Sequence, residues 1–106
     1  MKNLVIIVHT NTQRDVADLL RGLKQVPGFT IGQVEGHGVQ VENDPFLSTR
    51  DKVVGYVPRV RVDILLEDTD VDAVLEALRT NLSNIGGSVV FWIANVEGGR
   101  LLRTDP

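Results

Sequence analysis

The sequence predicts a single α+β domain in which four antiparallel strands form one sheet and two helices cover one of its faces. Two observations lead to this fold class. Four segments are short apolar runs or alternate with a period of two, and two segments between them carry apolar residues at helical spacing. The order strand, helix, strand also occurs twice, and both halves end in Val-Glu-Gly, at residues 34–36 and 96–98.

The first half begins with a strand expected over Lys2–His9, whose central residues leave no polar face. A helix follows, because Asn11 or Thr12 can cap the free amides of its first turn. Its apolar stripe, with the spacing i, i+3, i+4 and i+7, consists of Val16, Leu19, Leu20 and Leu23. Pro27 and Gly28 are expected to end this helix.

A second strand is expected from Phe29 to about Glu35, followed by a region over residues 36–52 that is rich in glycine, Asn, Asp and charge. Within that region, residues 42–52 are expected to form a flexible loop. The third strand is expected from about Val57 to Leu66, where the charged side chains Arg59, Arg61 and Asp63 alternate with apolar ones.

The second half continues with a helix from about Asp70 to Leu82, whose apolar stripe consists of Val71, Val74, Leu75, Leu78 and Leu82. Gly86-Gly87 predicts a turn, residues 88–97 the last strand, and residues 98–106 a polar tail. This is a duplicated βαβ arrangement of the ferredoxin-like type, formed by one domain over residues 1–106.

Helices can cover only one face of such a sheet, yet the first and last strands are apolar on both faces. In the last strand Phe91 and Ile93 alternate with Val90 and Trp92. Burying a Val, Ile or Phe side chain contributes roughly 1.5–3 kcal/mol, so a water-exposed second face would be costly. We therefore expect another copy of the chain, or a partner, to cover it. The alternative is that Trp92 and its neighbours lie under the long loop.

The amino-acid composition excludes several kinds of functional site and disfavours several partners. The 106 residues include no cysteine, which excludes disulfides, thiolate metal sites and a cysteine nucleophile. A net charge of −3 disfavours a nucleic-acid partner, because phosphate binding requires a basic face. No apolar run approaches the roughly 20 residues of a membrane span, and no signal peptide is visible, so a cytoplasmic protein without direct membrane insertion is expected.

Two segments resemble the PII signal-transduction superfamily. Thr30–Gln40 reads T-I-G-Q-V-E-G-H-G-V-Q, and Pro58–Asp63 reads P-R-V-R-V-D. PII proteins carry T-V-x-x-V-x-G-x-G-x-Q before a long flexible loop and P-K-V-K-(I/V)-D after it. The resemblance covers nearly the whole chain and is closest to short PII-like proteins. It implies a non-enzymatic regulator, a homotrimer with inward-facing sheets, and ATP or ADP bound between subunits.

The resemblance also implies a set of ligand-binding residues. With His37, which the two flanking glycines single out, the set is Thr30, Gly36, His37, Gly38, Gln40, Arg59, Gly87 and Arg103. Val41, Val90 and Leu101 stand where the family has cations. Each lost charge-assisted contact is worth roughly 1.5–3 kcal/mol, so ATP is not the only ligand to consider. ADP, AMP, a cyclic nucleotide or another anion stay open beside it.

The loop between the two motifs is shorter than in PII proteins, and its single nearby tyrosine, Tyr56, lies at its base. Some short PII-like proteins are associated with membrane transporters, including heavy-metal efflux systems, so the resemblance implies a transporter as the partner. The loop residues expected to contact it are Glu42, Asp44, Ser48, Arg50 and Lys52.

Gly36-His37-Gly38 has two further interpretations. It could be a glycine-relieved bulge that leaves His37 in water. It could also belong to a divalent-metal site in a trimer resembling the CutA proteins, with His37, Glu35 and Glu42 as ligands. The lack of the tryptophan-rich strand expected in CutA proteins counts against that alternative. No set of residues with catalytic spacing is present, so we do not expect an enzyme.

Overall fold

The computed structural model describes residues 1–38, 56–82 and 89–99, which carry four strands and two α-helices. The α-helices are α1 (Gln13–Gly22) and α4 (Val71–Leu82). The strands are β1 (Lys2–His9), β2 (Thr30–Gly36), β3 (Val57–Leu66) and β4 (Val90–Asn95). A short 3₁₀ turn precedes each α-helix, η1 at Thr10–Thr12 and η2 at Asp68–Asp70. The expected loop at 42–52, the turn at 86–87 and the tail from residue 100 lie outside the described residues.

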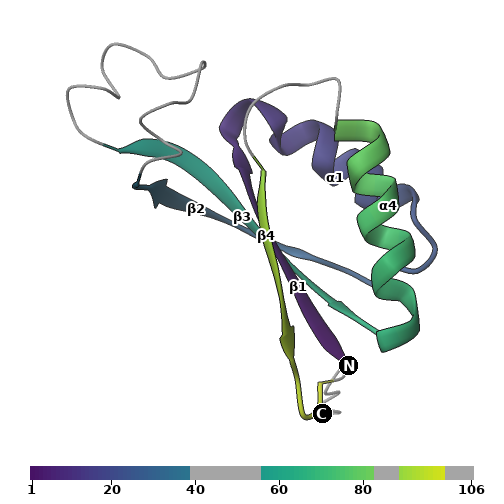
Figure 1. Ribbon diagram of the computed structural model, residues 1–106. Helices are drawn as coiled ribbons and strands as arrows, with labels where there is room; N and C mark the ends of the chain where they lie inside the picture. Colours follow the sequence, from purple (N-terminus) through teal and green to yellow (C-terminus); the bar gives the residue numbers. More distant parts are fainter. Residues whose placement is uncertain (39–55, 83–88, 100–106) are drawn as a thin grey trace, which may run out of the picture.

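The strands form one antiparallel sheet in the order β2-β3-β1-β4, which confirms the ferredoxin-like α+β fold. β1 lies in the centre and pairs with β3 on one side and with β4 on the other. Both α-helices pack on the same face of this sheet, while the β2–β3 hairpin extends past the helices (Figure 1). One face is therefore covered by helices, and the other is the open face.

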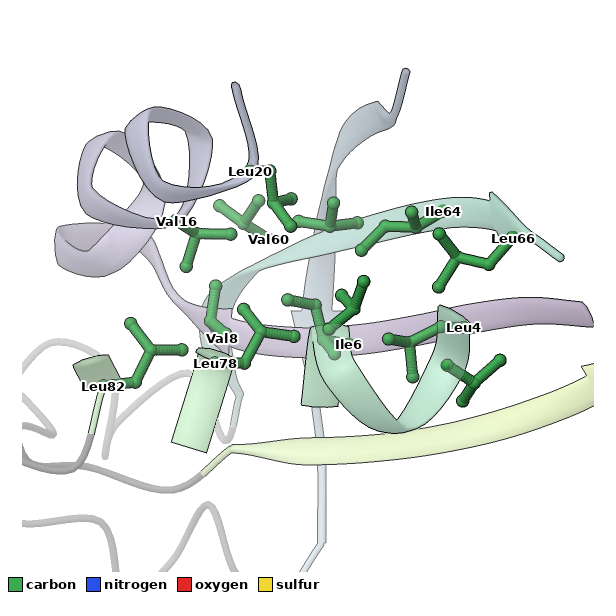
Figure 2. Close-up of a cluster of buried hydrophobic side chains, with 13 residues drawn as sticks. Leu4, Ile6, Val8, Val16, Leu20, Val60, Ile64, Leu66, Leu78 and Leu82 are labelled. Atoms are coloured by element: carbon green, nitrogen blue, oxygen red, sulfur yellow. The ribbon is translucent and has the colours of Figure 1, made fainter. Parts of the chain in front are cut away.

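The hydrophobic core lies between the helices and the covered face (Figure 2). Alternate residues of β1 and β3 point into it, because successive side chains of a strand face opposite sides. The helices contribute the stripes that the sequence predicts. Fully buried members from the four elements are Leu4, Ile6, Val8, Val16, Leu20, Val60, Val62, Ile64, Leu66 and Val74.

The ends of α1 differ from the prediction. Thr12 occupies the position before the helix but makes no side-chain capping hydrogen bond. Instead the Asn11 amide donates to Nδ1 of His9, 3.2 Å away, at the start of the preceding 3₁₀ turn. The helix also ends at Gly22, well before Pro27, because Leu23 has an extended backbone. Leu23 still packs against the core, so its side chain continues the apolar stripe of α1 although its backbone is not helical.

The other elements match the expected ones within one or two residues. β2 is shifted by one residue from Phe29–Glu35, and α4 begins at Val71 after the η2 turn. β4 covers residues 90–95 of the expected 88–97. Its apolar side chains, Val90 to Ile93, are exposed on both faces of this edge strand, whereas the sequence predicts that the helices cover one of them. The trimer itself stays a prediction.

Candidate functional site

The glycine pair of the first motif lies where β2 ends. Gly36 is the last residue of the strand and pairs with Val57, and His37 and Gly38 follow. Gly38 has φ of 119°, a backbone conformation that side-chain-bearing residues rarely adopt. An ideal Cβ at Gly38 would meet no atom within 4 Å, so the glycine is required by the backbone and not by crowding. The chain thus leaves the sheet at this point through a glycine-specific bend.

His37 is exposed beside this bend and contacts two side chains. Its Nε2 lies 3.2 Å from Oε2 of Glu35, and its ring centroid lies 5.7 Å from that of Tyr56, at a tilt of 37°. Both partners of the His37–Glu35 pair are mostly in water, where such pairs contribute little stability. The imidazole therefore follows the end of β2 and makes no strongly stabilising contact within the described residues.

Arg59 lies on the same hairpin but in a different environment. It is only 4% exposed, and its strand neighbours are Val34 on β2 and His9 on β1. A guanidinium that is buried to this degree must be held by compensating polar groups. Such burial suits a structural anchor within the sheet better than a group offered at the surface to phosphate.

Thr30 does not join this group within one chain. It begins β2 opposite Asp63, whereas Gly36 ends the strand opposite Val57. Six strand positions at about 3.3 Å each place them roughly 20 Å apart. The structure therefore brings Gly36, His37 and Gly38 together near Arg59 and leaves Thr30 at the far end. Gln40, Gly87, Arg103, Val41, Leu101 and the five candidate loop residues from Glu42 to Lys52 lie outside the described residues.

The open face carries a second arrangement of polar groups. Nε of Arg61 donates to Oδ1 of Asp63 at 2.8 Å, and Nη2 donates to Oδ2 at 3.1 Å. Nδ2 of Asn3, on β1, donates to the same Oδ2 at 3.1 Å. Hydrogen bonding from Arg61 first, and then from Asn3, lowers the pKa of Asp63 against the opposing effect of partial burial. The same pairing raises the pKa of Arg61.

Trp92 of β4 completes this arrangement. The guanidinium carbon of Arg61 lies 5.5 Å from the centroid of the Trp92 ring, within the range of a cation–π contact. β1 lies between β3 and β4, so the two side chains meet across it. Val5 of β1 is opposite both Asp63 and Trp92 and is only 1% exposed, although it is not part of the helix-covered core.

Sequence reasoning noted Arg61, Asp63 and Trp92 but missed Asn3 and the contact across β1. The alternation of β1 assigns Asn3 to the same face as Val5, and that signal was available. The register that brings Trp92 to Arg61 was not. Tyr56 was recognised only as the tyrosine at the loop base, and its contact with His37 depends on the hairpin geometry.

The described residues show neither a metal-binding cluster nor a membrane-spanning helix. They contain no group of three or more His, Asp or Glu side chains that could hold a metal ion. Of the three proposed metal ligands, His37 and Glu35 are adjacent, and Glu42 lies outside residues 1–38, 56–82 and 89–99. No helix in those ranges has the length and hydropathy needed to cross a bilayer.

The ferredoxin-like sheet with a glycine bend directly after β2 agrees with the arrangement expected for PII-like proteins. Similarity to known proteins identifies the family. The profile of the family described as "Protein of unknown function (DUF3240)" matches residues 1–101. A "Nitrogen regulatory protein P-II" from Rhizobium leguminosarum bv. viciae is 32% identical over 79 residues, 73% of this chain and 70% of the relative. The chain belongs to the DUF3240 family and, with it, to the PII-like signal-transduction proteins.

Further relatives agree. A "Nitrogen regulatory protein P-II" from Rhizobium meliloti (strain 1021) is 28% identical over 98% of this chain and 93% of the relative. A crystal structure of a DUF3240 family protein from Shewanella baltica OS155 superposes with a TM-score of 0.76 over 96% of both chains, at 20% identity, and so shares the fold. These relatives give no support to the CutA-like alternative.

Proposed function

We propose that this chain is a non-enzymatic cytoplasmic regulator that binds a small ligand between the subunits of a homotrimer. The ligand is an adenine nucleotide or a related anion. The observation that carries the proposal is the Gly36-His37-Gly38 bend at the base of the loop, in a chain of the PII-like family. It combines a glycine-specific backbone, which lets a ligand approach the main chain, with an exposed imidazole.

The separation of the candidate residues supports a site between subunits. Thr30 lies at one end of β2 and His37 just beyond the other, so one small ligand cannot contact both in the same chain. A second copy packed beside the first can bring its own Thr30 to the glycine bend. The site would then exist only in the assembled protein, and Gln40, Gly87 and Arg103 would complete it.

The ligand's charge follows from the departures from the family pattern. Val90, on β4, stands where PII proteins have a phosphate-binding lysine, and Val41 and Leu101 replace two further cations. Each missing cation weakens the binding of a triphosphate more than that of a monophosphate, because the triphosphate carries more negative charge that the site must neutralise. We therefore propose AMP, ADP or a cyclic nucleotide ahead of ATP.

Ligand binding would act on the loop at residues 42–52, which begins beyond the glycine bend. A ligand changes the loop only through different affinities for its conformations. In one conformation the residues Glu42, Asp44, Ser48, Arg50 and Lys52 would contact a partner, which we propose to be a membrane transporter such as a heavy-metal efflux system. The mixed charge of this segment suits a polar docking contact.

Isothermal titration calorimetry tests the ligand. The metal-free protein is titrated with ATP, ADP, AMP and cyclic AMP, and separately with zinc and copper ions. We expect saturable nucleotide binding near one ligand per chain. Arg103→Ala should weaken it by about tenfold or more, because a charge-assisted contact is lost. His37→Ala should weaken it as well, whereas Arg21→Ala, on the exposed side of α1, should not. Metal binding without nucleotide binding would contradict the proposal.

A further inference from the structure

The side chains of His37 and Tyr56 form an exposed pair of rings directly after β2, here called the ring pair. We propose that the ring pair binds the base of the nucleotide, so that the nucleoside end of the ligand, and not its phosphate, lies beside Glu35. This inference rests on the proposed function. It adds the orientation of the ligand and the side chains that recognise its base.

The register of the hairpin places the two rings together. Gly36 pairs with Val57 at the end of the ladder between β2 and β3, so His37 and Tyr56 follow as the next opposite positions. Their ring centroids lie 5.7 Å apart at a tilt of 37°, within the range of an attractive aromatic pair. Side chains directly opposite each other on neighbouring strands stabilise one another. The ring pair is therefore positioned by the hairpin itself.

The helices leave this end of the hairpin uncovered. Earlier in β2, Ile31 packs against the core, and Nε2 of Gln33 donates to Oε1 of Gln13, the first residue of α1, at 3.3 Å. Beyond this point the hairpin extends past the helices (Figure 1). The side chain of Glu35, two residues after Gln33, is 62% exposed, and that of His37 is 61% exposed. The imidazole is therefore accessible to a ligand.

An accessible aromatic pair suits a planar heterocycle. Nucleobases stack favourably on aromatic side chains, because every base has a π-face, and a phosphate has none. There is also room beside the imidazole. The next residue, Gly38, has φ of 119°, and an ideal Cβ built on it would meet no atom within 4 Å. The backbone at this bend therefore leaves space for a ring laid against His37.

The charge of Glu35 sets the orientation of the ligand. Oε2 of Glu35 lies 3.2 Å from Nε2 of His37, so a group that contacts the imidazole is also close to a carboxylate. A phosphate at this place would be repelled by the like charge. Ribose hydroxyls and the exocyclic amine of a base are donors, which an ionised carboxylate can accept. The nucleoside therefore lies beside Glu35, and the phosphate points away from it.

Proton NMR of the full chain tests the stacking directly, because the chain has one tyrosine and two histidines. The protein is titrated with AMP, with adenosine, which has no phosphate, and with ribose 5-phosphate, which has no base. We expect AMP and adenosine to shift the ring signals of His37 and Tyr56 upfield, through the ring current of the stacked base. Ribose 5-phosphate should cause no such shift. The variant His37→Leu distinguishes the signals of His37 from those of His9.

Calorimetry of three variants tests the recognition. His37→Leu removes the ring and should weaken the binding of AMP and of adenosine by about tenfold each, with that of ribose 5-phosphate unchanged. His37→Phe keeps a ring and should bind AMP within about threefold of the wild type. Glu35→Gln removes the charge and should change the affinities for AMP and adenosine by the same factor, because the phosphate lies elsewhere. The matched control Glu76→Gln, at an exposed position of α4, should change nothing.

Several results would overturn this inference while leaving the proposed function intact. These are AMP binding that His37→Leu leaves unchanged, AMP binding as weak in His37→Phe as in His37→Leu, or an equal loss of affinity for ribose 5-phosphate. A Glu35→Gln protein that gains affinity for AMP but not for adenosine would place the phosphate beside the carboxylate and overturn it too. A wild type that binds none of the three ligands would contradict the proposed function and this inference together. Circular dichroism shows that each variant is folded.

Discussion

The Arg61 guanidinium carbon lies 5.5 Å from the centroid of the Trp92 ring, although a complete strand, β1, lies between the strands that carry them. Neighbouring strands are about 4.8 Å apart, so this contact spans two strand spacings and needs the full length of an arginine side chain. It joins β3 to β4, which do not pair with each other. The open face of the sheet is therefore organised by side chains as well as by backbone hydrogen bonds.

Acidification should weaken the hydrogen bonds that Arg61 and Asn3 make to Asp63 on the open face. Its pKa is lowered in the folded chain, mainly by hydrogen bonding from Arg61. The resulting stabilisation is fully present above the unfolded-state pKa of about 3.9 and is lost as the pH falls through the lower folded-state value. Urea denaturation from about pH 7 down to about pH 3 measures this loss.

Asp63→Asn is the control for that measurement. It removes the titrating group, so its free energy of unfolding should decline less steeply below about pH 4 than that of the wild type. The lowered pKa values of Asp68 and Glu76 contribute to acid destabilisation in both proteins and cancel in the comparison. Identical pH profiles for the two proteins would contradict the prediction.

Leu20→Ala should destabilise the fold severely. Leu20 is fully buried between α1 and the covered face, and truncation of a buried leucine costs about 2–5 kcal/mol through lost transfer energy and the cavity left behind. Chemical denaturation gives the value. Leu65→Ala, a matched change at a leucine that is 42% exposed on the open face, should cost clearly less. Equal losses would show that the core is not where the structure has it.

His9→Ala should shorten or loosen the start of the first helical segment. Nδ1 of His9 accepts the Asn11 amide hydrogen at 3.2 Å, and the loss of a side-chain cap costs about 1 kcal/mol. Thermal unfolding monitored by circular dichroism measures it. His9→Asn supplies another capping acceptor and should recover part of the loss. If the His9→Ala and His9→Asn proteins are equally stable, the lost capping hydrogen bond is not the cause of the destabilisation.

Gly38→Ala should strain the bend that follows β2. The backbone there has φ of 119°, and a residue with a side chain held in such a conformation costs about 1–3 kcal/mol. Gly28→Ala is the matched control, because Gly28 has no positive φ and open space around it. Denaturant titration of both variants tests the difference. A Gly38→Ala protein as stable as Gly28→Ala would mean that the bend can relax.

The apolar pattern predicted most of the fold for physical reasons that operate locally. Apolar residues recur at every second position from Val57 to Leu66 and at helical spacing from Val71 to Leu82. Only a strand puts the first pattern on one continuous apolar side, and only a helix does so for the second. The end of α1 was predicted wrongly because Leu23 fits the helical stripe, yet it reaches the core from an extended backbone.

The candidate site was less predictable. The sequence motif placed Thr30 and Gly36 in one ligand set, whereas the register of β2 with β3 separates them along the strand. The Gly36-His37-Gly38 bend was identified from its composition alone, because few residues besides glycine adopt a positive φ. The partner of His37 across the hairpin, Tyr56, follows only from how the two strands approach each other.

Arg59 and Arg61 show which properties the sequence determines and which depend on the tertiary structure. The alternation of β3 by itself determined that both arginines share the face away from the helices. It did not determine that Arg59 is buried while Arg61 is half-exposed and bound to Asp63. Arg59 lies between Val34 and His9, whereas Arg61 lies between Gly32, which has no side chain, and Ile7. Burial depends on these cross-strand neighbours, and strand register, a property of the whole sheet, selects them.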